Sequence, residues 1–217
     1  MRKLLVSGLI IAGLFSAMLA HSAQYQLVMS PRLGVEDAET ATDLFLRDHW
    51  NGAQARVDNL TEHAAEIEDS MQHRSAHAST ERLFNSLLFQ LQRYAVRRKA
   101  PMDAALTANQ MAALLIDFAY PRAQGSLART AWLGYLGREV ELLARMPNDY
   151  GLLGRRIAEL QANWNGLRQR AVVQHHPRIA GQLQSTVADL SSTPPAPRLA
   201  HDGARIARLS ARLAKAT

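Results

Sequence analysis

Three side chains with the spacing of a metal site lie in the first half of the chain. His73, His77 and Glu81 follow one another at intervals of four residues, and in a continuous helix such intervals place side chains on one face. Two imidazoles and one carboxylate on one face can share a divalent cation. A divalent-metal site on these three residues is therefore one hypothesis.

The same segment also fits a turn between two helices. Residues 75–80 are small or polar, apart from the histidine, and suit a connection between helices. In this interpretation the histidines lie at the solvated end of a helical hairpin and no cofactor is bound. The interpretation without a cofactor is our principal one, and a metal-binding or metal-sensing protein is the alternative.

The sequence contains none of the common catalytic signatures. There is no G-x-S-x-G elbow, no phosphate-binding loop, no dinucleotide glycine pattern and no H-E-x-x-H motif. Cysteine is also missing, which excludes thiolate catalysis, cysteine-ligated metals and disulfide bonds. We therefore expect a protein that is not an enzyme and that acts by binding.

Apolar residues recur at alternating steps of four and three in two stretches, from Leu46 to Met71 and from Leu153 to Ala171. This period is typical of helices that bury one stripe against other helices. The predicted fold class is all-α, an antiparallel helical bundle with long heptad-patterned helices. Gly134 and Gly137 lie within another predicted helix and indicate the close approach of a neighbouring backbone.

Changes in composition divide the chain into five segments. Residues 1–23 have a positive start and an apolar run, which predicts a secretory signal peptide or an uncleaved anchor. Residues 24–35 are expected to be irregular. Residues 36–190 are the predicted bundle, residues 191–198 a proline-rich linker, and residues 199–217 a basic amphipathic helix. The predicted location is the periplasm, with inner-membrane anchoring if the leader is retained.

Two local patterns refine the predicted bundle. Its first helix is expected to run unbroken from Glu36 to Gln72, and Thr107 and Gln110 have the spacing of a capping box that would begin a later helix. The segment Leu106-Thr107-Ala108-Asn109-Gln110 also resembles the L-T-x-x-Q signature of the Spy and CpxP family of small periplasmic helical chaperones and stress regulators. This resemblance implies a chaperone-like or stress-sensing role for an exported helical protein.

Charge is distributed unevenly along the chain, whose formal net charge is +6. Residues 24–90 include 11 acidic and 5 basic side chains, whereas residues 91–217 include 8 acidic and 18 basic ones. Basic proteins are attracted to nucleic acid and to anionic membranes, but an exported protein does not meet nucleic acid. We expect the acidic first half and the basic second half to face each other within the bundle.

The C-terminal helix is the predicted interaction element. One face is cationic and the other aliphatic, and the residues of interest are Arg205, Arg208, Arg212, Ile206, Leu209 and Leu213. Such a helix can dock on its own bundle, in the groove of a partner or on lipid. We predict a non-enzymatic adaptor, sensor-type or chaperone-like protein that contacts an envelope protein or a second copy of itself, with an anionic membrane surface as the lesser alternative.

Overall fold

The computed structural model describes residues 31–73, 78–120, 125–146, 150–192 and 194–216. Over these residues the chain is all-α, as predicted, and contains no strand. Its helices are residues 31–45, α2 (Trp50–Glu62), α3 (Ala64–His73), α4 (Ala78–Arg97), α5 (Pro101–Ala119), α6 (Gly125–Arg145), α7 (Tyr150–Leu167), α8 (Ala171–Gln174), α9 (Pro177–Leu190) and α10 (Ala196–Lys215). None of the described helices is both long and apolar enough to cross a bilayer.

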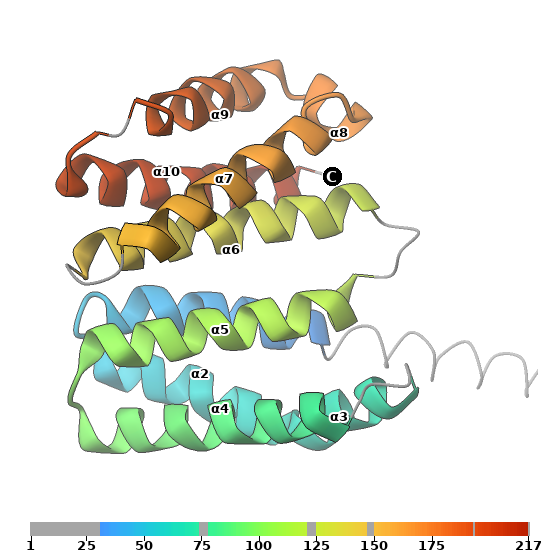
Figure 1. Cartoon of the computed structure of the whole chain (residues 1–217). Coiled ribbons are helices and arrows are strands. Elements are labelled where there is room, and N and C mark those ends of the chain that lie inside the picture. The colour runs from blue at the N-terminus through green and yellow to red at the C-terminus, as the bar shows by residue number, and fades with distance from the viewer. Residues whose placement is uncertain (1–30, 74–77, 121–124, 147–149, 193, 217) are drawn as a thin grey trace, which may run out of the picture.

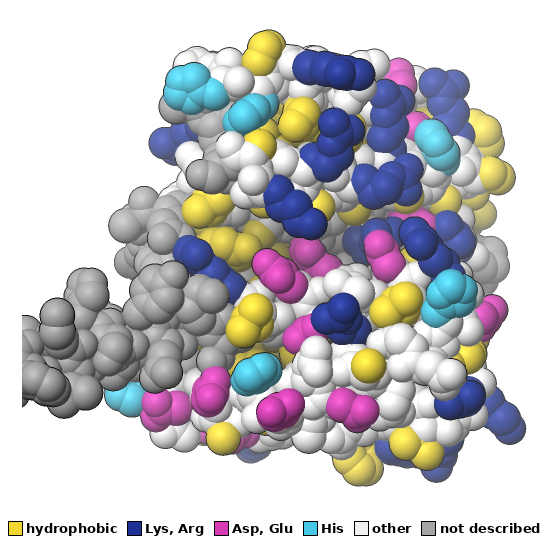
Figure 2. Space-filling model, turned by 180° about the vertical axis from the view of Figure 1, so that it is seen from behind, with side chains coloured by type: hydrophobic (Ala, Val, Ile, Leu, Met, Phe, Trp, Pro, Cys, Tyr) yellow, Lys and Arg dark blue, Asp and Glu magenta, His cyan; other side chains and the backbone are white. Residues whose placement is uncertain are grey.

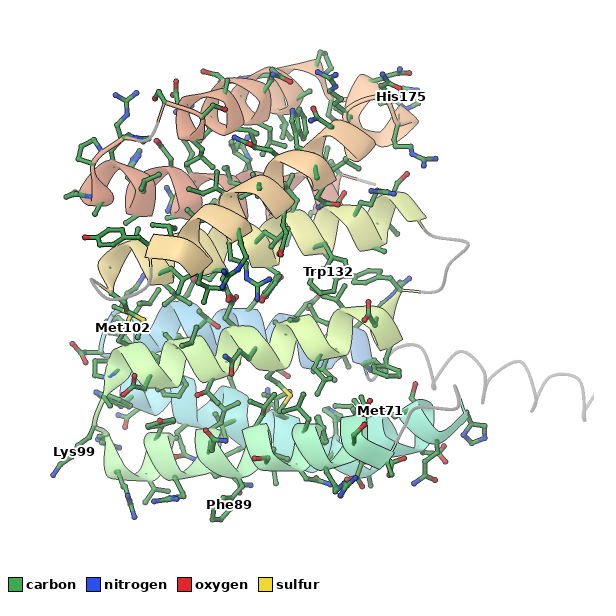
Figure 3. The ribbon with its side chains drawn as sticks, in the orientation of Figure 1. Met71, Phe89, Lys99, Met102, Trp132 and His175 are labelled. Atoms are coloured by element: carbon green, nitrogen blue, oxygen red, sulfur yellow. The ribbon has the colours of Figure 1, made fainter. Side chains whose placement is uncertain are left out.

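The helices form two groups that lie one above the other in Figure 1. The lower group contains residues 31–45 and helices α2 to α5, in which α4 packs against both α2 and α5. The upper group contains α6 to α10, and its most extensive contact is between α6 and α10. Packing of α5 on α6 joins the two groups. The core is therefore made by helices that pack on helices. Phe89 of α4 is an apolar side chain outside it, exposed and pointing away from the other helices (Figure 3).

Both apolar stripes identified in the sequence contribute to the core. Val57, Leu60 and Ile67 of the first stripe are fully buried or nearly so, and Leu160 and Leu167 of the second are buried to the same degree. Full burial of one such side chain contributes about 1.5–3 kcal/mol to the free energy of unfolding. Most members of the two stripes therefore face inward, as predicted, whereas Leu46, Trp50, Ala64 and Ile157 are only partly buried.

The prediction of one unbroken helix from Glu36 to Gln72 is wrong. Residues 46–48 form a turn in which Asp48 has a φ of 55°, and His63 separates α2 from α3. A residue in the left-handed region interrupts a right-handed helix. The turn folds α2 back beside residues 31–45, where Arg56 Nη1 lies 3.0 Å from Asp37 Oδ1.

Three further boundaries differ from those predicted. Helix α5 begins at Pro101, because proline is well suited to a first helical turn in which its missing amide is not needed. Thr107 is consequently in mid-helix, where its hydroxyl donates to the Asp103 carbonyl at 2.8 Å and forms no capping box. Residues 31–35 are helical rather than irregular, and α10 begins at Ala196, inside the predicted linker.

Helices α6 and α10 approach so closely that their backbones are in contact. A Cβ atom on Gly203 would lie 2.6 Å from the Gly137 carbonyl oxygen and 2.7 Å from the Glu141 backbone nitrogen. A Cβ atom on Gly137 would lie 2.9 Å from the backbone nitrogen of Ala207. Only glycine fits at these two positions without a shift of the backbone, so the close packing predicted for Gly137 is confirmed. At Gly134 a Cβ atom would make ordinary contacts only.

We expect Gly203→Ala to lower the free energy of unfolding by about 2 kcal/mol, since the added methyl group must push α6 away from α10. Urea denaturation of the two proteins measures this loss. Gly154→Ala in α7 is the matched control, because a Cβ atom there meets nothing within 4 Å. That variant should gain about 0.5–1 kcal/mol. Equal stability of the two variants would contradict the backbone contact.

Candidate functional site

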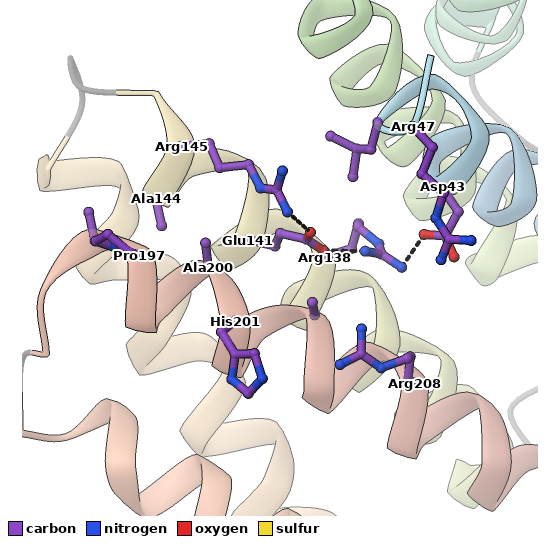
Figure 4. Close-up of a pocket in the computed structure, with 13 residues that line it drawn as sticks. Asp43, Arg47, Arg138, Glu141, Ala144, Arg145, Pro197, Ala200, His201 and Arg208 are labelled. Atoms are coloured by element: carbon purple, nitrogen blue, oxygen red, sulfur yellow. Dashed lines mark hydrogen bonds and ion pairs between the residues drawn. The ribbon is translucent and has the colours of Figure 1, made fainter. Parts of the chain in front are cut away.

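A cleft of about 640 Å³ opens beside α6 and α10 (Figure 4). It is lined by the end of the helix at residues 31–45 with the turn that follows, by the second half of α6 and by the first half of α10. Its basic side chains outnumber its acidic ones, the basic set being Arg47, Arg138, Arg145, His201 and Arg208 and the acidic set Asp43 and Glu141. Such an excess attracts anionic groups.

Two carboxylates hold Arg138 in this cleft. Its guanidinium group pairs with Asp43 of the helix at residues 31–45 and with Glu141 of α6 (Figure 4). Arg145 donates to the second oxygen of Glu141 at 2.6 Å. Because the side chain of Glu141 is only 4% exposed, its charge requires this compensation for lost hydration. The pairing between Asp43 and Arg138 also ties the lower group of helices to the upper one.

A second hollow of about 650 Å³ continues from the cleft. It shares Asp43, Arg138 and Arg208 with the cleft, and it lies between residues 31–45 on one side and α6 and α10 on the other. The cleft and the hollow are thus parts of one depression, which we call the arginine groove. The groove follows the seam between the two groups of helices.

Glu39 lines the second hollow with a poorly solvated carboxyl group. Burial raises the pKa of Glu39 to about 7, Arg138 opposes that rise, and the negative charges of Asp43 and Glu36 add to it. A Cβ atom on Gly134 would lie 3.7 Å from Glu39 Oε1, so the carboxyl group rests against α6. Glu39 is therefore about half protonated near neutral pH.

Other polar groups of the second hollow come from three different elements. The hydroxyl of Ser210 on α10 is buried and makes no hydrogen bond with any described residue. The Arg32 guanidinium lies 5.3 Å from the centre of the Tyr120 ring, in a cation–π arrangement. Burial raises the pKa of the Tyr120 hydroxyl, and the charge of Glu39 adds to this while Arg32 opposes it. Acidic and basic side chains are consequently closer to equal in number in the hollow than in the cleft.

A partly buried polar cluster beside the second hollow links α5, α6 and α7. Asn109 donates to Glu139 Oε2 at 2.9 Å, and Arg156 Nε lies 3.4 Å from Glu139 Oε1. Arg156 also donates to Glu159 at 2.6 Å. Burial raises the pKa of the Tyr135 hydroxyl, and the neighbouring Glu139 adds to that rise. Arg156 is thus the shared partner of two glutamates, and its buried Nε makes no hydrogen bond with a described residue. The cluster connects α5 and α7 to α6.

The residues predicted to bind a partner are divided between core and surface. Ile206, Leu209 and Leu213 are buried within the molecule, so the aliphatic face of α10 is already covered. Arg208 and Arg212 are exposed, whereas Arg205 is only partly so. Of the predicted set, Arg208 is the residue that lines the arginine groove.

The predicted metal ligands are not brought together by the described part of the chain. His73 ends α3 with an exposed side chain whose Nδ1 lies 3.3 Å from Asp69 Oδ1, and Glu81 lies in the first turn of α4. His77 lies outside the described residues. Among the residues that are described, no group of three or more histidine or acidic side chains could hold a metal ion. The metal site stays a prediction.

Sequence reasoning missed the residues that build the arginine groove, above all Glu39, Asp43, Arg138 and Glu141. One signal was present, namely the spacing of Arg138, Glu141 and Arg145 in the second half of α6, where apolar residues alternate with them. Side chains three and four residues apart on a helix can form ion pairs. The pattern did not indicate that Asp43 completes the set, because Asp43 and Arg138 are far apart in the chain.

Comparison of the chain with protein-family models, with curated proteins and with solved structures finds no match. The geometry of the groove itself indicates a binding site. The groove is open, its cleft contains a surplus of arginine, and ion pairs fix Arg138 and Arg145 in place. Such a site can bind an anionic group without moving its backbone.

The raised pKa of Glu39 predicts a pH dependence of stability. Between about pH 4.5 and 7 the unfolded chain releases the Glu39 proton before the folded one does, so the free energy of unfolding falls as the pH rises. Between pH 5 and pH 8 we expect the free energy of unfolding of Glu39→Gln to fall by about 1–3 kcal/mol less than that of the unchanged protein. Urea denaturation at both pH values measures it. Glu62→Gln, on the exposed surface of α2, is the control, and an identical pH profile in both variants would contradict the burial of Glu39.

Proposed function

We propose that this chain is a non-enzymatic binding protein of the periplasm that acts as an adaptor, sensor-type or chaperone-like protein through contacts with other proteins. The observation that carries the proposal is the cleft of the arginine groove, in which ion pairs hold Arg138 and Arg145 in place while Arg208 remains exposed. Fixed guanidinium groups favour binding, since little side-chain entropy is lost when they engage a partner. The apolar leader at residues 1–23 supports export.

We further infer that the helices form an antiparallel bundle with heptad-patterned packing. Helices α4 and α5 pack together and are joined by three residues, and α9 and α10 also pack together with a short connection between them. Short connections between neighbouring helices favour opposite directions. The buried stripes at Val57 to Ile67 and at Leu160 to Leu167 support the heptad pattern. A rigid bundle would present the groove as a preformed surface.

The distribution of charge over the surface supports contact with an acidic partner. Figure 2 displays lysine and arginine side chains gathered over the half of the molecule that contains α9 and α10, whereas most acidic side chains of this view lie in the other half. On this face of the molecule, basic and acidic side chains therefore lie mostly in different halves. A positively charged face steers negatively charged partners toward it and increases the association rate.

We expect substitution of Arg205, Arg208 and Arg212 by glutamine to reduce the capture of at least one envelope protein about fivefold or more, because each lost rim charge weakens a contact by up to about 1 kcal/mol. Immobilised full-length chain, envelope extract and quantitative mass spectrometry measure this loss. Deletion of α10 is a poorer test, since it would expose the face of α6 that α10 covers.

The matched control replaces Arg82, Arg97 and Arg155, which lie on α4 and α7 and outside the groove, by glutamine. It removes the same charge and should retain the partners of the unchanged chain. If the two triple variants capture the same proteins in the same amounts, the proposed contact surface is wrong.

A further inference from the structure

We propose that the cleft of the arginine groove is the docking site for a short acidic segment of the partner protein, one in which carboxylate side chains alternate with small aliphatic ones. This inference rests on the proposed function and names the chemistry by which the partner is recognised. It is carried by three features: two arginines in the cleft whose side chains pair with no described residue, a floor of small apolar residues, and a surplus of positive charge that is smaller beyond the cleft than within it.

The cleft contains two arginines whose charge no described residue compensates. Asp43 and Glu141 pair with Arg138 and Arg145, so their negative charges are already matched. Arg47 and Arg208 also line the cleft, and both are exposed. Neither side chain makes a hydrogen bond or an ion pair with another described residue. Two free guanidinium groups at one cleft favour an anionic occupant.

The free arginines come from opposite walls of the cleft. Arg47 belongs to the turn after residues 31–45 and Arg208 to α10, and the paired Arg138 of α6 lies between them in Figure 4. A guanidinium fork binds a carboxylate through two parallel hydrogen bonds. In an extended segment of alternating residues the small aliphatic side chains share one side and can face the floor, while the carboxylates share the other side and can face the exposed arginines of both walls.

The floor of the cleft is apolar and made mostly of small side chains, namely Leu46, Ala144, Ala196, Pro197, Ala200 and Ala204. Small side chains leave the volume of about 640 Å³ open. An apolar floor has no hydrogen bonds to offer a free phosphate ion or a sulfate ion, whereas it can cover aliphatic side chains of a peptide. The floor therefore favours a peptide segment over a small inorganic anion.

The surplus of positive charge is smaller beyond the cleft, which favours an occupant with a short charged segment. The adjoining hollow contains Glu36 and Glu39 as well as Arg32 and Lys215, so carboxylates or phosphates would meet both signs of charge there. A long, uniformly charged polyanion would meet these residues along the groove. A protein segment can instead place its acidic residues in the cleft and neutral ones in the hollow.

Fluorescence anisotropy with full-length chain tests this inference, with a short labelled peptide of alternating glutamate and alanine as the probe. The double variant Arg47→Gln and Arg208→Gln should weaken binding about tenfold. The control variant Arg97→Gln and Arg155→Gln removes the same charge outside the groove and should change the affinity less than about twofold. Since Arg47 and Arg208 are exposed and unpaired, both double variants should denature in urea at the wild-type midpoint.

Two further arms separate the recognition of a peptide from a general attraction of charges. Replacing glutamate by glutamine in the probe should abolish binding, and Ala144→Leu, which fills part of the floor without a change of charge, should weaken it about fivefold. Equal affinity in the two double variants, or displacement of the peptide by inorganic phosphate at constant ionic strength, would overturn the inference. If no acidic peptide binds while capture of envelope proteins still depends on the arginines of α10, the inference fails and the proposed function stands.

Discussion

The backbone contact between α6 and α10 is the constraint on which the rest of the structure depends. Gly137 and Gly203 let the two helices approach until main-chain atoms touch, which no residue with a Cβ atom permits without a shift. This approach brings Arg208 of α10 to the same groove as Arg138 of α6. The cost of two glycines within helices is about 1 kcal/mol each relative to alanine, and the extensive packing between α6 and α10 offsets it.

The ion pairs of Arg138 fix a charged side chain in the groove beside the contact between α6 and α10. An arginine that is 13% exposed and a glutamate that is 4% exposed lose much of their hydration on folding, so each needs the other. Asp43 supplies the second carboxylate from the other group of helices. Because Arg138 is held on both sides, its position does not depend on a ligand, and the cleft keeps its shape when it is empty.

The apolar pattern of the sequence was sufficient for the fold class and for much of the core. The stripes that contain Leu60 and Leu160 are buried as their spacing predicts, because the period of a helix determines which side chains share a face. Helix boundaries were less predictable. The turn at Asp48 and the start of α5 at Pro101 each follow from the backbone conformation of one or two residues. A repeat of apolar residues does not encode such local conformations.

The arginine groove as a whole could not be predicted, because its walls come from separate helices that meet only through the tertiary fold; only Arg138, Glu141 and Arg145 are close in sequence. The pairing of Asp43 with Arg138 joins residues that are far apart in the chain, and neither residue stands out from the other charged side chains of a solvated helix face. The amphipathic pattern of α10 illustrates the same limit. Its aliphatic stripe, which includes Ile206 and Leu209, is equally suitable for an external partner or for the chain's own core.

A second stripe of small residues on α10 lies beside the aliphatic stripe and determines how closely α10 packs on α6. Its members are Ala200, Gly203, Ala204, Ala207 and Ser210. Small side chains along one line of a helix allow another backbone to approach. In this chain the line meets Gly137 of α6, so the aliphatic stripe is buried internally and the cationic face is left for solvent. Gly137 and Gly203 together therefore allow α10 to complete the protein's own core, and its exposed arginines, Arg208 and Arg212, remain at the surface.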